Sequence, residues 1–272
     1  MGLLRCVLFL LPAFLVAGTV SAQGADGVAS LSASLQGASL DVQSAQVNPG
    51  GLPMPGLGAV VKEMPRDLWR FLSVDTAIVL GAGVAAAGIA HIWDDDLKQQ
   101  VDESPQLNDA LDPGHTYGAF GFQSLVGVGV YGIGWLAGSS SLAITGADIM
   151  RAQLVSQVWV QGIKFTAQRT RPDGSNDQSF PSGHSASAFA TAAVLHRHYG
   201  WKVGIPAYLV GGYVATARVH DNRHYLSDVV FGAAMGFAGE RTVMRSGRYT
   251  VRFAPAAGSQ MASLTILVSP RP

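Results

Sequence analysis

The chain has 272 residues, of which 48% are hydrophobic and only 13% are charged. This composition excludes an intrinsically disordered protein and is typical of a globular or membrane protein. Because 18 Lys and Arg balance 18 Asp and Glu, the overall charge gives no reason to expect nucleic acid as a partner, and any basic site must be local.

Residues 1–22 are expected to form a signal peptide. An apolar stretch begins at Cys6 and ends in Val20-Ser21-Ala22, which fits a small-x-small cleavage site. An uncleaved membrane anchor is the alternative interpretation. Cleavage would remove the single cysteine, so the mature protein would contain no disulfide and no cysteine nucleophile. We therefore expect an exported, periplasmic protein.

Residues 23–62 are rich in Ser, Gly, Ala and Gln and are expected to form a flexible, low-complexity lead. A helical domain is expected over residues 63–242. Pro65 stands at its first helix start, and an apolar run from Ala77 to Trp93 follows as one helix or two joined helices.

A polar connection is expected next, over Asp94-Asp95-Asp96 and residues 105–114. The three aspartates lack the spaced oxygen ligands of a calcium loop, which favours a solvated turn. The following apolar stretches, Tyr117 to Ile149, are interrupted by Gly138 and three serines. This pattern predicts a second helix before the serines and a third that continues to about Lys164.

Three further helices are expected, over Ser185–Tyr199, Val203–Ala217 and Tyr225–Glu240. The predicted fold is therefore mainly α, a six-helix bundle. The uncharged run that begins at Ser185 is shorter than the about 20 residues that span a bilayer. A soluble or surface-bound bundle is favoured for this reason, and a multi-pass inner-membrane protein is the alternative.

Residues 243–272 differ from the preceding helices. The runs Tyr249–Phe253 and Ser263–Val268 are rich in β-branched and aromatic residues and are separated by Pro, Gly and Ser. They predict a β-prone tail with a hairpin or two short strands.

Lys164 and Arg171 lie at the end of the third predicted helix and in the loop after it. They offer one compact charge and one planar guanidinium, which suit the binding of phosphate oxygens. On their own they could equally be basic residues that flank an apolar helix.

The tetrapeptide Pro181-Ser182-Gly183-His184 immediately precedes the next predicted helix. Backbone N–H groups at a helix start face an anion favourably, and Gly183 allows close approach. Ser182 could add a hydroxyl donor, and His184 could protonate a leaving alkoxide. A simple helix cap beside an incidental histidine is the alternative.

Arg218, His224 and Asp228 form the third segment. His224 and Asp228 are four residues apart at a helix start, so the carboxylate could orient the imidazole as a nucleophile. A zinc or iron site that includes His220 is an alternative, although the neighbouring cations disfavour it. A buried core histidine with a carboxylate partner is another alternative.

Together, the three segments resemble the motifs of the type 2 phosphatidic acid phosphatase superfamily, which includes bacterial class A acid phosphatases, lipid phosphatases and vanadium haloperoxidases. The resemblance covers Lys164 to Asp228. It implies that His184 protonates the leaving group, that His224 is the nucleophile and that Asp228 orients it. The implied phosphate ligands are Lys164, Arg171, Ser182, Gly183 and Arg218. One departure is Ala217, where the family usually has a serine.

The resemblance implies hydrolysis of phosphomonoesters through a phosphohistidine, with no metal and no cofactor. The expected substrate is a phosphorylated small molecule or a lipid or isoprenoid phosphate, with a membrane surface as a further partner. Two other functions stay open: a vanadate-dependent haloperoxidase, and a non-catalytic protein that binds phosphate or phospholipid.

Overall fold

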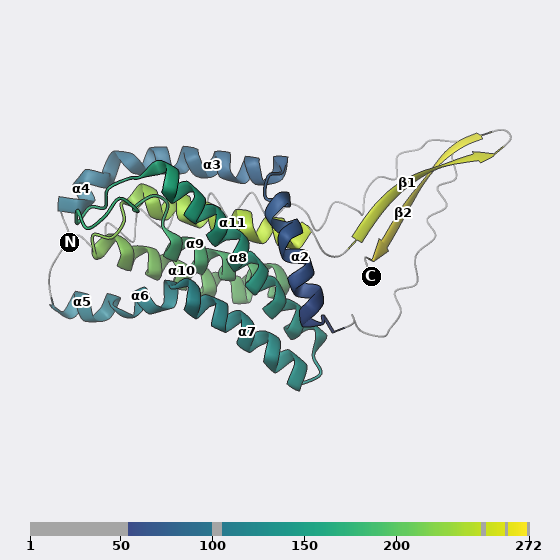
Figure 1. The fold of residues 1–272 in the computed structure, drawn as a ribbon, viewed down its shortest axis with the longest axis horizontal. Helices are drawn as coiled ribbons and strands as arrows, with labels where there is room; N and C mark the ends of the chain where they lie inside the picture. The colour runs from purple at the N-terminus through teal and green to yellow at the C-terminus, as the bar shows by residue number, and fades with distance from the viewer. Residues whose placement is uncertain (1–53, 100–104, 246–248, 259–260, 271–272) are drawn as a thin grey trace.

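A computed structural model describes residues 54–99, 105–245, 249–258 and 261–270. The predicted signal peptide, and the predicted lead up to residue 53, lie outside these ranges. The described part of the chain is mainly helical (Figure 1), which confirms the predicted fold class.

The helices, in chain order, are α2 (Leu57–Arg70), α3 (Val74–Ala90), the 3-10 turn η1 (His91–Trp93), α4 (Asp94–Gln99), α5 (Pro105–Leu111), α6 (Pro113–Gly118), α7 (Phe120–Leu136), α8 (Ser140–Ala167), α9 (Gly183–Tyr199), α10 (Trp201–His220) and α11 (Leu226–Arg245). The described residues thus contain ten α-helices, where six are expected from the sequence. The first helical segment, expected as one helix or two joined helices, forms two helices, α2 and α3. The break occurs because the Ser73 side chain caps a new helix by accepting the N–H of Thr76. The predicted polar connection contains the short helices α4, α5 and α6.

Helices α8, α9 and α11 pack against one another in the middle of the bundle, while α7 packs on α8, α10 on α9 and α3 on α11. The long helices lie side by side, and α2 crosses one end of them (Figure 1). The largest fully buried side chains, Phe189, Ile149 and Met235, come from the three central helices. The site described below is therefore carried largely by the rigid centre of the fold.

Glycines on α11 let its backbone approach α9 closely. A Cβ atom added at Gly232 would lie 2.5 Å from the Ser182 carbonyl oxygen, and one added at Gly236 would lie 2.5 Å from the Ala186 carbonyl oxygen. Any side chain at either position would push the helices apart. The two glycines thus fix the position of the α9 N-terminus on α11.

The outer helices expose apolar side chains. Exposed fractions reach 77% at Val74 on α3 and 91% at Leu136 on α7. By length and composition, the segment Val74–Gln99 could cross a membrane, and the bent pair Leu107–Gly118 and Phe120–Leu136 could form a second span if it is one unit. These apolar faces are unlike the polar surface expected for a soluble bundle.

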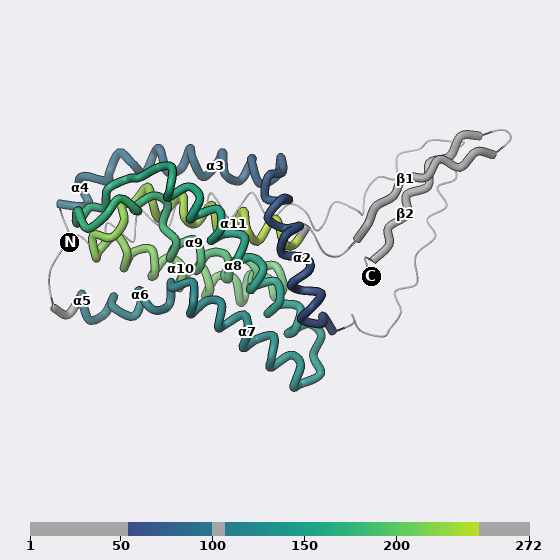
Figure 2. The backbone as a smooth tube through the Cα atoms, viewed as in Figure 1, coloured from purple at the N-terminus to yellow at the C-terminus, as the bar shows by residue number. Residues whose placement is uncertain are grey.

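The loop between α8 and α9 lies at the end of the bundle where α3 passes into α4 (Figure 2). In the tail, β1 (Tyr249–Gly258) pairs antiparallel with β2 (Met261–Pro270), with Tyr249 opposite Pro270 and Gly258 opposite Met261. This hairpin agrees with the predicted β-prone runs.

Candidate active site

The predicted site residues converge at one end of the bundle, although they come from four elements and a loop. They are Lys164 near the end of α8, Arg171 in the following loop, Ser182, Gly183 and His184 at the start of α9, Arg218 in the last turn of α10, and His224 and Asp228 at the start of α11. Helix ends and the loop after α8 thus supply every predicted group, and these are places where backbone groups and side chains can face one ligand.

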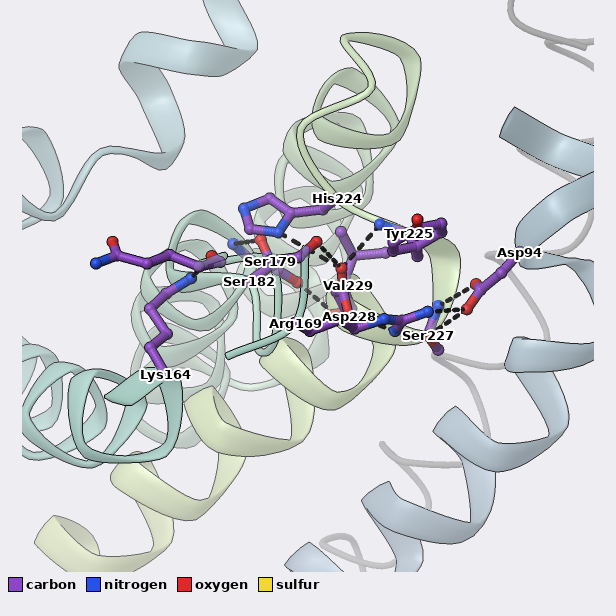
Figure 3. Close-up of polar contacts among 12 residues, drawn as sticks. Asp94, Lys164, Arg169, Ser179, Ser182, His224, Tyr225, Ser227, Asp228 and Val229 are labelled. Carbon is purple, nitrogen blue, oxygen red and sulfur yellow. Dashed lines mark hydrogen bonds and ion pairs between the residues drawn. The ribbon is translucent and has the colours of Figure 1, made fainter. Parts of the chain in front are cut away.

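His224 is buried and faces the carboxylate of Asp228 (Figure 3). Its Nδ1 atom lies 3.7 Å from Asp228 Oδ2, and the two side chains are 2% and 0% exposed. Burial lowers the pKa of His224 to about 4, although Asp228 acts in the opposite direction. The imidazole is therefore neutral near pH 7, the form in which a ring nitrogen can attack phosphorus.

Asp228 is held by three hydrogen bonds. Its Oδ2 accepts the Tyr225 backbone N–H at 2.9 Å and the Ser179 hydroxyl at 2.5 Å, and its Oδ1 accepts Arg169 Nη1 at 2.7 Å. The Tyr225 contact is half of a capping box, because Asp228 is the third residue of α11. Burial opposes ionisation, but His224, Ser179 and Arg169 hold the pKa of Asp228 below its ordinary value.

Cations crowd this end of the bundle: Lys164 and Arg218 act through space on His224, and Arg171 acts on Lys164. Lys164 is buried, its ammonium donates to the Gln178 carbonyl oxygen, and burial together with Arg171 lowers its pKa to about 8. Arg218 is also buried, with Nη1 3.1 Å from Asp221 Oδ2, and burial lowers its pKa to about 10. Crowded cations with few carboxylates between them favour the binding of an anion.

His184 is the second residue of α9, and its ring lies beside that of His115, with 5.3 Å between centroids. Burial and the nearby charge of Arg218 lower the pKa of His184 to about 3. Ser182 is the N-cap, and its Oγ accepts the N–H of Ser185 at 3.4 Å. Since that bond uses only an acceptor position, the hydroxyl hydrogen of Ser182 can be donated to an anion.

Gly183 packs tightly against α8. A Cβ atom there would lie 3.2 Å from Gln157 Oε1, and Gln157 Nε2 donates to the Gly183 carbonyl oxygen at 2.8 Å. This contact leaves the Gly183 N–H at the open start of α9, where helix N–H groups have no intrahelical acceptor.

Besides His224 Nδ1, three buried side-chain nitrogens in this cluster have no hydrogen-bond partner within the described ranges. They are Arg171 Nε, Arg218 Nε and His184 Nε2. Buried donors are nearly always paired in native proteins. Arg171, Arg218 and His224 all act electrostatically on His184, so these nitrogens belong to one cluster. Together with the excess of cations, they predict a bound tetrahedral anion.

The metal-site alternative finds no support in the geometry. Among residues 54–99, 105–245 and the two strands, no group of three or more His, Cys, Asp and Glu side chains could hold a metal ion. His220 Nδ1 instead lies 3.8 Å from Asp221 Oδ1. The fold thus does not bring the set His220, His224 and Asp228 together as ligands.

Residues 147–252, which carry all of these side chains, match the sequence profile of the PAP2 superfamily. Over these residues the chain is similar to the PAP2 superfamily. The match confirms the family resemblance that the three sequence segments predict.

Individual relatives agree with the PAP2 assignment. A lipid A 1-phosphatase of Porphyromonas gingivalis is 42% identical over 76 residues, which cover 27% of this chain and 17% of the relative. A lipid A 4'-phosphatase of Helicobacter pylori is 30% identical over 98 residues, covering 31% of this chain and 50% of the relative. The chain thus spans half or less of the length of these curated relatives.

A solved structure also resembles the chain. It is a transmembrane PAP2-type phosphatidylglycerolphosphate phosphatase from Bacillus subtilis, with a TM-score of 0.44 and 20% identity, covering 69% of this chain and 94% of that one.

Ala217 replaces the serine that usually precedes the arginine of the third PAP2 motif. Ala217 is fully buried, and a Cβ atom added at Gly114 on α6 would lie 2.6 Å from the Ala217 Cβ. The Ala217 side chain therefore packs against α6, and the small residue permits the close contact between α6 and α10.

The candidate site includes residues that sequence reasoning misses. The expectation of a solvated turn is wrong for Asp94, which is 2% exposed and bonded to Arg169 and Ser227. Arg169 and Ser179 both contact Asp228. Arg169 stands two residues before Arg171 and could be noticed as a second arginine of the motif, but nothing local marks Asp94.

Proposed function

We propose that the protein is a phosphatase that hydrolyses phosphomonoesters through a phosphohistidine on His224. The observation that carries this proposal is the cluster of unpaired donors, Arg171 Nε, Arg218 Nε and His184 Nε2, around a buried imidazole. A site that only bound phosphate would need the donors but not the buried pair of His224 and Asp228. The names of the two lipid A phosphatases support the same chemistry.

The proposed first step is in-line attack by His224. Because Nδ1 faces Asp228, Nε2 is the attacking atom. The Nε2–P bond forms as the ester P–O bond breaks, and the cations and the α9 N-terminus neutralise charge on the equatorial oxygens. Asp228 stabilises the positive imidazole that results.

His184 supplies the proton for the leaving oxygen. Burial and the surrounding cations hold its pKa at about 3. A bound phosphate places negative charge beside the ring and favours its protonated form, so the proton is acquired with the substrate. In the second step a water molecule transfers a proton to His184 and attacks phosphorus, the Nε2–P bond breaks, and phosphate is released.

We propose a phosphorylated lipid as the substrate, with phosphorylated glycolipids of the lipid A type first among the candidates. Ile92 in η1 and Phe165 beside Lys164 are 72% and 73% exposed. They place apolar surface near the same end of the bundle as the cations, which suits a phosphate attached to a lipid. The relatives that are named for lipid A support this class.

We further propose that residues 1–22 export the protein to the periplasm and that it acts at a membrane. The uncharged stretch of α3 after Asp75 and the uncharged α7 carry exposed apolar faces along most of their length. Single exposed apolar residues are ordinary on a protein surface, but continuous apolar faces of this kind are typical of surfaces that contact lipid.

Phosphate release by the purified full-length chain tests the proposal. The substrates are p-nitrophenyl phosphate, a short-chain phosphatidic acid and lipid A, each with EDTA present. We expect release by the wild type, loss of several orders of magnitude in His224→Ala, and little change in His196→Ala, whose histidine contacts Tyr208 instead. A ³²P label should be trapped on the wild type in a base-stable, acid-labile form.

Three outcomes would contradict the proposal. Undiminished release by His224→Ala would remove the phosphohistidine, and phosphate binding without release would support a non-catalytic protein. Vanadate-dependent halogenation by peroxide, in the absence of phosphate release, would instead support the haloperoxidase.

A further inference from the structure

The guanidinium of Arg169 bridges the catalytic end of α11 and the start of α4 (Figure 3). Its Nη1 donates to Asp228 Oδ1 at 2.7 Å, and its Nη2 donates to Asp94 Oδ2 at 2.8 Å. The guanidinium also lies over the ring of Tyr225, 4.0 Å from its centroid. A planar fork between two carboxylates and a ring has little freedom to rotate.

Asp94 fixes the other side of this bridge. Its Oδ1 accepts the Ser227 backbone N–H at 2.9 Å, and its Oδ2 accepts the Ser227 hydroxyl at 2.6 Å. Nη1 of Arg169 also donates to that hydroxyl oxygen, at 2.7 Å. Asp94 therefore holds both Arg169 and the first turn of α11, although it lies 133 residues before Ser227 in the chain.

We propose that Arg169 and Asp94 are positioning residues, which hold the Asp228 carboxylate so that Oδ2 faces the imidazole of His224. The inference rests on the proposed phosphohistidine mechanism. A carboxylate turns easily about its last torsion. Arg169 fixes Oδ1, and this turns Oδ2 toward His224. Oδ2 also accepts the Tyr225 N–H and the Ser179 hydroxyl, and it lies 3.7 Å from Nδ1.

The charge of Arg169 matters as well as its shape. Lys164 and Arg171 also act on Asp228 through space, but Arg169 is a cation that contacts the carboxylate directly. Burial favours the neutral carboxyl group, and Arg169 opposes this effect. Loss of the cation should therefore raise the pKa of Asp228. On acidification, the carboxylate would then become protonated at a higher pH than in the wild type.

An ion pair that merely holds the fold together is the competing explanation, and the chain provides a matched control. Arg151 on α8 binds the buried carboxylate of Asp67 on α2 through Nε and Nη2, both at 2.7 Å. It lies 13 residues before Lys164 on the same helix, or about 20 Å along it. Arg151→Lys should weaken the fold as Arg169→Lys does, without touching Asp228.

The experiment compares kcat and KM for p-nitrophenyl phosphate from pH 4 to 9, alongside thermal unfolding, in four full-length variants. Arg169→Lys should lower kcat about 10- to 100-fold and change KM less than about threefold, because orientation is lost but charge is kept. Arg169→Gln should also shift the acidic limb of kcat to higher pH. Asp94→Asn should have a smaller effect of the same kind, and Arg151→Lys should lower only the unfolding temperature.

Chemical rescue provides a second test that does not depend on a conservative variant. The Arg169 side chain is 26% exposed, so a small cation from solution can reach its place. Added guanidinium at millimolar concentration should raise kcat of folded Arg169→Ala severalfold, and it should not raise kcat of Arg151→Ala. Equal responses of the two variants would overturn the inference.

Failure of this inference and failure of the proposed function are distinguishable. If His224→Ala is inactive while Arg169→Lys keeps the kcat and pH profile of Arg151→Lys, the positioning role is wrong and the phosphohistidine mechanism stands. If His224→Ala is fully active, the mechanism itself is wrong, and the positioning role is overturned with it.

Discussion

The imidazole of His224 and the carboxylate of Asp228 face each other across 3.7 Å inside the bundle. This separation is longer than a hydrogen bond and should shorten when positive charge forms on the ring. Asp228→Asn removes the charge that stabilises this ring, so kcat should fall about 10³-fold or more. Steady-state kinetics with p-nitrophenyl phosphate checks this. Asp109→Asn, at an exposed position of α5, is the control, and equal rates in the two variants would rule out the role of Asp228.

The pKa of Lys164, lowered to about 8 by burial and by Arg171, predicts an alkaline limit. The ammonium is charged below this pKa and loses its charge as the pH rises through it. Since kcat/KM reports the free enzyme, it should decline above about pH 8. In the complex, bound phosphate raises the pKa, so kcat should decline only at higher pH.

Lys164→Arg tests this assignment. Arginine keeps its charge throughout this pH range, so the decline of kcat/KM near pH 8 should disappear whatever the variant's absolute rate. If kcat/KM of Lys164→Arg still declines near pH 8, the titrating group is a residue other than Lys164.

The leaving group should determine how much His184 matters. p-Nitrophenolate departs without protonation, whereas an alkoxide needs a proton. His184→Ala should therefore lose about 10²- to 10⁴-fold in kcat with an alkyl phosphate and markedly less with p-nitrophenyl phosphate. Parallel assays of both substrates measure the ratio. Equal losses would indicate that His184 binds phosphate but does not act as the general acid.

Gly232 controls where the N-terminus of α9 lies, the end that we propose binds phosphate. A Cβ atom at this position would meet the Ser182 carbonyl oxygen at 2.5 Å, so Gly232→Ala should displace Ser182 and the residues that follow it. We expect kcat to fall about 10- to 100-fold and the free energy of unfolding to fall by about 1–3 kcal/mol.

Gly212→Ala is the matched control for Gly232→Ala. It lies on α10 with nothing within 4 Å of the added Cβ atom. This substitution should keep kcat and raise the free energy of unfolding by about 0.5–1 kcal/mol. Chemical denaturation and kinetics of both variants provide the comparison, and an unimpaired Gly232→Ala would show that α9 can shift without cost to the site.

The exposed apolar face of α7 should contribute to membrane binding. Leu125 and Ile133 are 66% and 58% exposed. Their joint replacement by Glu should reduce the fraction of protein that floats with phospholipid vesicles by about tenfold or more. The kcat for p-nitrophenyl phosphate should be unchanged, since α7 carries no site residue. Gln161→Glu, at an exposed polar position of α8, is the control, and unchanged flotation of the double variant would contradict lipid contact by this face.

Local pattern was sufficient for the mainly α class and for helix starts near Ser185 and Tyr225, and it predicted the groups that the structure brings together at one end of the bundle. These features are readable because the spacing of apolar residues, helix caps and motif residues acts over a few positions. The comparisons support the family assignment in the same region. The short helices α4 to α6 were missed because polar, proline-containing stretches are also typical of loops.

The sequence by itself determined which chemical groups the protein has and which of them lie at helix starts. Only the tertiary structure decided which partners hold the Asp228 carboxylate, since Arg169 meets Asp94 across 75 residues and Asp228 across 59. It also decided which faces of α3 and α7 stay exposed. Such contacts depend on how helices pack, and packing is set by shape and burial summed over the whole domain, which no local spacing records.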